Sequence, residues 1–387
     1  MNTIKKALVI GGGIGGMCAS IQLRKLGLDI DLVEINPQWS VYGAGITISG
    51  PTLRALREIG VHREVIAQGG HWDHIDICAA NGARLAEVSL GAAHGAEDMP
   101  RSAAILRPVL AAILADAVLA AGVDVRLGVS FTRIAQDVEG VDVHFTDGRT
   151  ARYDLVVGAD GIHSQVRAAV FPDAAAPSFT GQGSWRTLVP RTVRNSTIFM
   201  GNTTKAGVNP VSDTEQYLFC LDQRDADEFI EPQTWPLRLA ELLAEFGGTL
   251  AEVRDALRSG AIPASRIVYR PLFSVMLPGP WHRGRVVLLG DTVHATTPHL
   301  ASGAGLAVED AVVLAQELEK LAPSQAQRGG ALTLDAALTA YFTRRHERSR
   351  MVVESSIRLG RIEQHGGSRD EHTQVMQDAM LALAEVI

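Results

Sequence analysis

The chemistry of this sequence begins at a run of glycines near its N-terminus, in LVIGGGIGGMCAS (residues 8–20). Gly11, Gly13 and Gly16 have the spacing G-x-G-x-x-G, between a short apolar run and a stretch of helical periodicity. The first glycine of such a motif permits a tight turn, the second admits a pyrophosphate, and the third lets helix and strand pack closely. The helix N-terminus then offers free N–H groups to the phosphates. The motif predicts a dinucleotide site with contacts from Gly11, Gly13, Ile14, Gly15 and Gly16.

An acidic residue follows at the distance that a ribose contact requires. Glu34 lies at the end of a second apolar run, DIDLVEI (29–35), eighteen positions after Gly16. Its carboxylate can accept hydrogen bonds from the adenosine ribose and would repel a 2′-phosphate. The order of strand, glycines, helix and acid favours this interpretation over a flexible turn with a solvated glutamate. It does not separate NAD from FAD.

Two stretches far downstream each deliver an aspartate at the end of an apolar run. The first is DLVVGADGIHSQVR (154–167), with Asp160 and Gly161. The second is RVVLLGDTVHATTPHLASGAG (285–305), in which Asp291 can bond to a polyol chain such as ribitol. The loop that follows leads into a long helix, whose free N–H groups would stabilise negative charge on the pyrimidine edge of a reduced isoalloxazine ring. These features favour a flavin.

Taken in order, the three motifs resemble the single-component FAD-dependent aromatic hydroxylases. These are the group A flavoprotein monooxygenases, related to 4-hydroxybenzoate, salicylate and 6-hydroxynicotinate hydroxylases, and the resemblance runs from residue 5 to about 360. It implies that NADH or NADPH reduces FAD, which reacts with dioxygen to a C4a-hydroperoxide. The distal oxygen is then transferred to a small aromatic or N-heteroaromatic substrate, phenolic or carboxylated. Such enzymes serve in aromatic compound catabolism.

The resemblance also implies cofactor contacts at matching positions. The glycine motif and Glu34 would hold pyrophosphate and ribose, while Pro298 would line the reactive face of the ring. Ser302 departs from the family's pattern, because relatives often carry glutamine there. The contacts implied toward ribitol and the flavin are Gly45, Ile46, Arg107, Asp160, Gly161, Asp291, Gly303, Ala304 and Gly305.

Catalytic side chains are harder to identify, because the cofactor supplies the oxygen chemistry. The protein has to exclude water, place the substrate ring and assist its deprotonation. Thr47 stands where 6-hydroxynicotinate hydroxylases have histidine, so a direct analogue of that histidine is missing. His299 suits a phenolate contact or a structural hydrogen bond equally, and Arg186 suits a carboxylate, the flavin or the surface. We predict catalytic roles for His299, Tyr217 and Pro298, and substrate contacts from Thr47, Trp185 and Arg186.

The pattern of elements predicts an α/β fold with a discontinuous Rossmann-type FAD-binding domain, an inserted β-sheet substrate domain and C-terminal helices. Asn81-Gly82 and Asp147-Gly148 indicate hairpin turns. One helix is expected near residues 235–259, and a polar loop at 322–333. The FAD-binding domain is predicted from 1–74, 100–175 and 271–320, the substrate domain from 75–99 and 176–270, and the C-terminal helical region from 321–387.

Composition excludes several classes of function. The formal net charge is −7 and the pI is near 6.0, so no nucleic-acid or membrane partner is expected. The apolar N-terminal run is too short and too rich in glycine to span a bilayer. The three cysteines are far apart and lack CxxC spacing, which predicts no disulfide or metal site and a cytoplasmic location. A monomer or homodimer is expected.

Three alternatives remain open at this point. A flavin-free NAD-dependent dehydrogenase would leave both downstream motifs without a purpose. A flavin-bearing regulatory protein would show no NAD(P)H oxidation stimulated by an aromatic compound. A monooxygenase of the same fold could instead act on a larger antibiotic-like or olefinic substrate. A halogenase is disfavoured, because the chain has no Trp-x-Trp-x-Ile-Pro run.

Overall fold

A six-stranded sheet carries the glycine motif. The computed structural model describes residues 4–41, 43–201, 204–321 and 332–387. In this sheet the strand order is β18-β19-β12-β1-β2-β8, and every neighbouring pair is parallel except β18 with β19. The central strands β1, β12 and β19 are short runs rich in valine and leucine, as expected for parallel strands covered on both faces. Their bounds are β1 (Lys6–Ile10), β2 (Asp29–Glu34), β8 (Asp124–Leu127), β12 (Leu155–Gly158), β18 (His282–Arg283) and β19 (Val286–Leu288).

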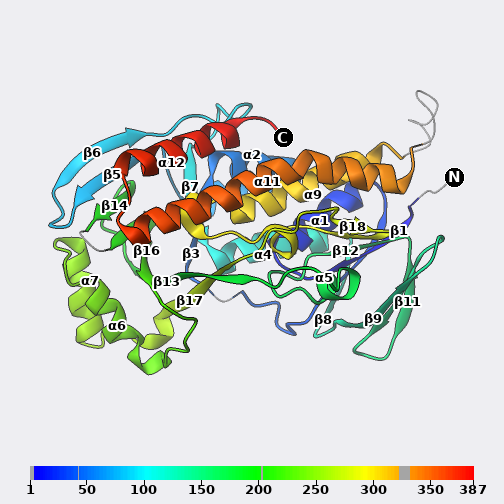
Figure 1. The fold of residues 1–387 in the computed structure, drawn as a ribbon, viewed down its shortest axis with the longest axis horizontal. Helices are drawn as coiled ribbons and strands as arrows, with labels where there is room; N and C mark the ends of the chain where they lie inside the picture. The colour runs from blue at the N-terminus through cyan, green and yellow to red at the C-terminus, as the bar shows by residue number, and fades with distance from the viewer. Residues whose placement is uncertain (1–3, 42, 202–203, 322–331) are drawn as a thin grey trace.

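Long helices pack on this sheet and on one another. Helix α9 contacts α1, α2 and α11, and Figure 1 shows α9 and α11 lying side by side along the length of the molecule. The sequence spacing predicts a buried stripe of Ala307, Ala311, Leu314, Leu318 and Leu321; the first four are buried, and Leu321, beyond the end of α9, is half-buried. The bounds are α1 (Ile14–Lys25), α2 (Gly50–Ile59), α3 (His62–Gln68), α4 (Arg107–Ala120), α9 (Gly303–Glu319) and α11 (Leu334–His365).

The second large sheet has seven strands, in the order β17-β13-β16-β15-β14-β5-β6. Strand β5 pairs in parallel with β14, so the hairpin at Asn81-Gly82 joins the strands that follow residue 176. We propose that this sheet is the substrate domain, although β17 extends four residues beyond the expected boundary at 270. The bounds are β5 (His74–Ala79), β6 (Arg84–Ser89), β13 (Ser178–Pro190), β14 (Ser196–Met200), β15 (Lys205–Pro210), β16 (Glu215–Gln223) and β17 (Ile267–Ser274).

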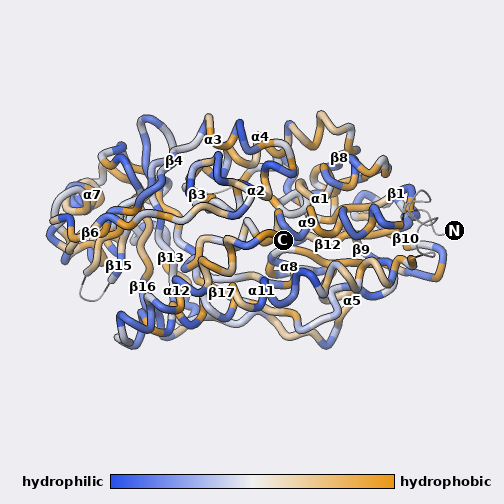
Figure 2. Tube along the Cα trace, turned by 90° about the horizontal axis from the view of Figure 1, so that it is seen from above, coloured by the Kyte–Doolittle hydropathy of each residue, from blue (hydrophilic) through white to orange (hydrophobic). Residues whose placement is uncertain are grey.

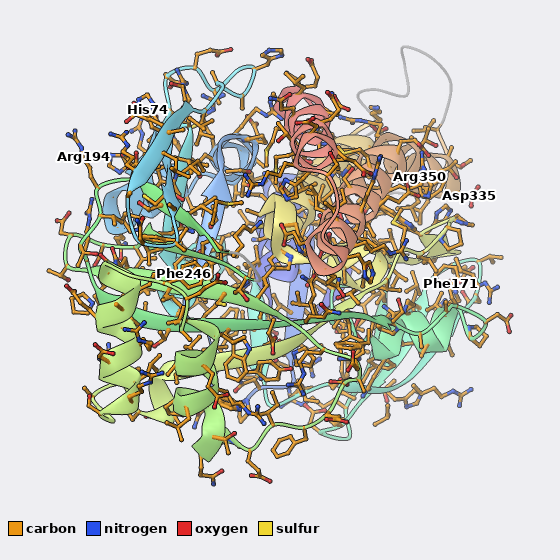
Figure 3. The ribbon with its side chains drawn as sticks, turned by 60° about the vertical axis from the view of Figure 1, so that its left-hand side comes forward. His74, Phe171, Arg194, Phe246, Asp335 and Arg350 are labelled. Atoms are coloured by element: carbon orange, nitrogen blue, oxygen red, sulfur yellow. The ribbon has the colours of Figure 1, made fainter. Side chains whose placement is uncertain are left out.

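The helix expected near 235–259 is two helices, so that prediction was wrong. α6 (Trp235–Leu242) and α7 (Thr249–Arg258) are separated by Gly247 and Gly248, and Gly248 has a φ of +57°. A residue with this backbone conformation interrupts a right-handed helix. Phe246, just before the break, is buried where these helices meet the sheet (Figure 3). The helices thereby cover one face of the seven-stranded sheet.

Two small sheets complete the architecture. The first small sheet has the strand order β3-β7-β4 and joins the two large sheets. The second is a meander of β9, β10 and β11, with its turn at Asp147-Gly148. Figure 2 shows α7, β6 and β15 at one end of the molecule and β1, β8 and β10 at the other. The bounds are β3 (Gly45–Ser49), β4 (Gly70–Trp72), β7 (Ser102–Leu106), β9 (Phe131–Gln136), β10 (Val141–Phe145) and β11 (Thr150–Tyr153).

The last helix, α12 (Arg369–Ala384), is attached to the FAD-binding part by arginines. Ser368 caps its N-terminus by accepting a hydrogen bond from the N–H of Glu371. At the other end, Arg54 donates to the carbonyls of Ala384 and Glu385, and Arg348 donates to those of Ala382 and Leu383. Both arginines also approach Glu309 of α9. The C-terminal turn is therefore held against α2, α9 and α11.

Candidate FAD site and substrate site

The three sequence motifs meet at one edge of the six-stranded sheet. Strands β1, β12 and β19 are neighbours and parallel, so their carboxyl ends lie together. The close approach requires glycine at position 11, because a Cβ there would lie 2.4 Å from the carbonyl oxygen of Ala159. The φ of Gly11 is also +109°, in the region that favours glycine. A Cβ at Gly16 would lie 1.9 Å from the carbonyl oxygen of Gly11. The close packing of α1 against the end of β1 therefore requires glycine at position 16 too.

Two helix N-termini at this edge lack a capping side chain. Neither Gly13, the N-cap of α1, nor Ser302, the N-cap of α9, makes a side-chain cap hydrogen bond, and neither first turn contains an acid. No atom lies within 4 Å of the position of a Cβ on Gly13. Free N–H groups and a positive dipole end, open on one side, suit an anionic ligand. Gly303, Ala304 and Gly305 are the first three residues of α9.

Glu34 lies beside the glycine motif. One carboxylate oxygen accepts a hydrogen bond from the N–H of Gly12 at 2.6 Å, and the other accepts from Asn36 at 2.8 Å. Each carboxylate oxygen has two acceptor positions, so both retain one for a ribose hydroxyl. The indole of Trp39 donates to the carbonyl of Gly12 at 2.8 Å and holds this turn from the outside.

The Arg107 guanidinium lies further along this edge and has no ion pair with other described residues. Burial and the neighbouring charge of Arg186 lower the pKa of Arg107 to about 10, while Asp291 and Tyr217 act against this shift. Burial raises the pKa of Asp291, against the influence of His294 and Arg107. Asp291 is nevertheless exposed to solvent. Two cations and a carboxylate therefore face the same region.

The Asp160 carboxylate is engaged by hydrogen bonds within its own turn. Its carboxylate accepts hydrogen bonds from the Ser164 hydroxyl and from the N–H groups of Gln165 and Val166, at the start of α5 (Gln165–Val170). The N–H of Gly161 donates to the hydroxyl of Thr292, in α8 (Asp291–His294). We propose that Asp160 serves the site by holding this turn. The same turn fixes the segment that bears Asp291.

Buried charges lie under the Gly290-Asp291 turn. Asp310 accepts a hydrogen bond from the N–H of Gly290 at 2.9 Å and from Arg345 at 2.8 Å, and its other contact is His294 Nε2 at 2.6 Å. Burial alone would raise the pKa of Asp310, but His294 and Arg345 outweigh it and bring the pKa to about 2. The Asp310, His294 and Arg345 side chains are fully buried. The turn therefore rests on an ionised carboxylate.

A polar cluster joins the substrate sheet to strand β3. The hydroxyls of Thr47 and Tyr217 lie 2.6 Å apart, and the Asn209 amide nitrogen donates to Tyr217 at 2.8 Å and to Thr47 at 3.2 Å. The Tyr217 ring lies against Gly45, where a Cβ would approach it to 2.0 Å. The predicted residues Thr47 and Tyr217 are thus brought together. Ile46, the neighbour of Thr47 on β3, is half-buried and packs against the large hydrophobic core.

Two other predicted residues, Trp185 and His299, pack against neighbours outside this cluster, and their substrate and catalytic roles stay predictions. Trp185 is on the opposite face of β13 from Arg186, buried against Tyr269 and Trp235. The side chain of His299 is 1% exposed, with its Nδ1 2.9 Å from the Thr297 hydroxyl and its Nε2 3.4 Å from Glu363 Oε2. Both are packed away from the Tyr217 cluster by their own neighbours.

Pro298 begins the 3₁₀ turn η3 (Pro298–Leu300), immediately before the start of α9. Gly15 is a packing position, since a Cβ there would lie 2.8 Å from Leu289. Among the residues that the structure describes, no group of three His, Cys, Asp or Glu side chains has the arrangement of a metal site. None of the described helices combines the length and apolar character needed to cross a bilayer.

These observations define a dinucleotide-binding oxidoreductase with a separate substrate sheet. The chain belongs to the family described as the FAD binding domain, whose model matches residues 5–356. It is a FAD-dependent monooxygenase, which confirms the resemblance to the group A flavoprotein hydroxylases.

Relatives extend over most of the chain. It is 31% identical to an aurachin C monooxygenase/isomerase of Stigmatella aurantiaca, over 94% of this chain and 91% of that protein. It is 32% identical to 3-amino-4-hydroxybenzoate 2-monooxygenase of Streptomyces cremeus, over 83% and 80% of the two chains. The structure of Klebsiella pneumoniae HpxO complexed with FAD and uric acid matches with a TM-score of 0.80, at 25% identity, over 98% and 92%.

The site residues fit FAD. The open helix N-termini suit the pyrophosphate and the electron-rich edge of the ring, and Glu34 and Asp291 offer carboxylates to two polyols. Arg107 supplies a cation without an ion-pair partner among the described residues. None of the described side chains lies within 4 Å of the position of a Cβ on Gly13.

The sequence alone did not identify Asn209 or the buried ion pair of Asp310 and Arg345 below Gly290. Asn209 stands in the apolar run KAGVNP. A polar amide inside such a run was the only available sign of a buried polar contact. Asp310 and Arg345 lie on helices with apolar stripes, and a charged residue in such a stripe indicates a buried pair. Their partners become visible only in the fold.

Proposed function

We propose that this protein hydroxylates the ring of a small aromatic or N-heteroaromatic substrate, with electrons from NADH or NADPH and an oxygen atom from dioxygen. Relatives act on rings of this kind, according to their names: 3-amino-4-hydroxybenzoate, and 6-hydroxynicotinate in the relatives from Bordetella bronchiseptica and Pseudomonas fluorescens. The observation that carries the proposal is the cluster of Thr47, Tyr217 and Asn209. It places two hydroxyls and an amide at the strand that flanks the cofactor edge.

Bound FAD would accept a hydride from the nicotinamide and activate dioxygen for transfer to the ring. The protein's part is to hold it. We propose that α1 and Glu34 bind the adenosine and pyrophosphate half, and that Arg107 and Asp291 bind near the ribitol. The start of α9 would face the flavin ring, with Pro298 on its reactive side.

Tyr217 is the proposed acid–base group for the substrate. Hydroxylation is favoured by an electron-rich ring, and a phenol is most electron-rich when its O–H hydrogen bonds to, or passes its proton to, an acceptor. The Tyr217 hydroxyl can take the hydrogen-bonding role, because it can accept a hydrogen bond from the substrate O–H while it donates its own hydrogen to the Thr47 hydroxyl, 2.6 Å away. Asn209 keeps both hydroxyls in place, and the buried position of Tyr217 excludes bulk water.

A panel of phenols, aromatic acids and hydroxypyridines tests the proposal. For the correct class, NADH or NADPH oxidation is stimulated and the product gains one oxygen atom by mass spectrometry. Oxidation that is equal with and without every compound, and that yields only hydrogen peroxide, would refute hydroxylation. The matched variant Tyr217→Phe should retain flavin and lose hydroxylated product relative to peroxide.

We also propose a cytoplasmic location and a monomer or homodimer as the assembly. The support for the location is that the three cysteines, Cys18, Cys78 and Cys220, are all buried free thiols. Size-exclusion chromatography with light scattering would test the assembly. A tetramer or larger particle would contradict it.

A further inference from the structure

The segment that leads into α9 contains a residue in a strained backbone conformation. Ala301 has a φ of +49° and a ψ of 29°, in the left-handed region that residues with a Cβ rarely adopt. Such a conformation persists only where surrounding contacts hold it, and it is typical of functional sites. Ala301 lies between η3 and Ser302, the N-cap of α9. Its conformation therefore sets the direction in which the first turn of α9 points.

The imidazole of His299 connects this segment to another helix. His299 lies in η3, and its side chain is 1% exposed. Its Nδ1 lies 2.9 Å from the Thr297 hydroxyl, and its Nε2 lies 3.4 Å from Glu363 Oε2, near the C-terminal end of α11. Among the described residues, no other acidic side chain forms an ion pair with residues 297–302. Glu363 therefore restrains η3 from outside the segment.

Glu363 is an ionised carboxylate with its two oxygens directed to different partners. Oε1 lies 2.5 Å from Lys205 Nζ on β15 and 3.0 Å from His372 Nε2 on α12. Burial would raise the pKa of Glu363, but His299, His372 and Lys205 outweigh burial and bring the pKa well below its usual range. Oε2 is left for His299. The charge is thus neutralised at Oε1, while Oε2 keeps the imidazole in place.

The backbone of α11 sets the position of this carboxylate. Gly360 lies one turn before Glu363. A Cβ at Gly360 would lie 3.0 Å from His299 Cε1 and 2.8 Å from Gln182 Oε1, on β13. Glycine at this position therefore lets the helix lie directly against both η3 and the seven-stranded sheet. A helix in such close contact leaves Glu363 little freedom to move away from His299. The restraint on η3 is built into the packing of α11 and does not depend on Lys205.

We propose that Glu363 is a positioning residue for the flavin. Through His299 it holds η3 and the strained Ala301, and thereby directs the free N–H groups at the start of α9 toward the flavin ring. These groups stabilise the negative charge that the ring gains on reduction. Glu363 therefore raises the reduction potential of bound FAD. This inference rests on the proposed placement of the ring at α9, and it does not depend on the identity of the substrate.

Two variants that differ only at position 363 test the proposal. Lys205→Met removes the ammonium group on β15 and leaves Glu363 with both histidines. Lys205→Met/Glu363→Met also removes the carboxylate, and it replaces a largely buried ion pair by two apolar side chains of similar length, a change that is often neutral for stability. The measurement is the two-electron midpoint potential of the FAD-loaded proteins, from a spectroscopic reductive titration against a reference dye. Melting temperatures are recorded in parallel.

The double variant should have the lower potential. We expect it to favour reduced over oxidised FAD about tenfold less than Lys205→Met does, which is within the effect of a helix terminus on a nearby charge. For a two-electron couple, this factor corresponds to a potential about 30 mV lower. Lys205→Met should keep the potential of the unaltered protein. Equal potentials in the two variants would overturn the proposal, and a lower melting temperature at an unchanged potential would show that Glu363 serves stability alone.

Replacing Ala301 by glycine tests the strain. Glycine adopts the left-handed conformation without steric cost, so the segment no longer needs the contact between His299 and Glu363. Adding Ala301→Gly to the double variant should therefore bring the potential back toward that of Lys205→Met, and no recovery would refute the role of Ala301. If the potentials differ as expected but no aromatic compound is hydroxylated, the proposed function fails and this inference stands. If hydroxylation is found with equal potentials, only this inference fails.

Discussion

Replacing Asp310 by asparagine tests whether the Gly290-Asp291 turn depends on a buried charge. The carboxylate contacts Arg345, His294 and the N–H of Gly290 at 2.6–2.9 Å, and none of the three side chains is exposed. Asparagine has nearly the same shape and no charge. It leaves the Arg345 guanidinium with Glu309 as its only acidic partner among the described residues, and His294 facing an amide.

The expected size of the effect follows from burial. Breaking a fully buried ion pair by removing one partner costs about 3–5 kcal/mol. Over 387 residues, an unfolding entropy near 2.1 cal/mol/K per residue sums to about 0.8 kcal/mol/K. The melting temperature should therefore fall by about 4–6 °C. Because the pKa of Asp310 is about 2, its carboxylate stays ionised and the loss should be constant from pH 5 to 8.

A surface pair provides the control. Glu354 is 60% exposed and lies 2.9 Å from Arg350, which projects from α11 in Figure 3. Such a pair contributes about 0.5 kcal/mol or less, so Glu354→Gln should lower the melting temperature by less than about 1 °C. Melting curves of the flavin-loaded proteins provide the measurement. Similar shifts for Asp310→Asn and Glu354→Gln would refute the view that the turn rests on a buried ionic cluster.

The remaining predictions concern the cofactor, the substrate cluster, the thiols and acid stability. Asp291→Ala should lower the FAD content of the purified protein, and an unchanged ratio of flavin to protein absorbance would show that the ribitol contact is misplaced. Tyr217→Phe should reduce hydroxylated product per NAD(P)H about tenfold at equal flavin content, whereas unaltered coupling would exclude its acid–base role. Burial raises the pKa of Cys18 to about 12, so a thiol reagent at pH 8 should label none of the three cysteines before unfolding, and rapid labelling would contradict this. Burial would raise the pKa of Glu363, but His299, His372 and Lys205 bring it well below its usual range. The stability that Glu363 contributes is therefore present above the usual glutamate pKa and lost on acidification, so the melting difference from Glu363→Gln should shrink below pH 4.

The FAD-binding part of the fold could be predicted because each of its sequence motifs is local. A buried strand, three glycines and a helix occur within twenty residues, and the parallel arrangement of three such strands brings their ends together without further information. The α/β class follows from these signals, a flavin was favoured by the two downstream motifs, and monooxygenase activity was implied by the family resemblance; all three predictions are confirmed.

The substrate half depends on register, which a single sequence does not contain. Tyr217 faces Asn209 because β15 and β16 pair those two residues, and a shift of one position would turn Tyr217 toward α6. The alternation of side chains along a strand places Trp185 and Arg186 on opposite faces of β13, but it does not say which of them faces the cofactor. The surroundings of His299 could not be foreseen, because its neighbour Glu363 lies on a helix sixty-four positions later.

The arginine clamp on the last turn of α12 has a consequence for synthesis in the cell. Arg54 and Arg348 reach their carbonyl acceptors only after residues 382–385 have left the ribosome, and both arginines also approach Glu309 at the start of α9. A chain that stops before residue 382 therefore lacks the hydrogen bonds that hold the last turn of α12 against α2 and α11.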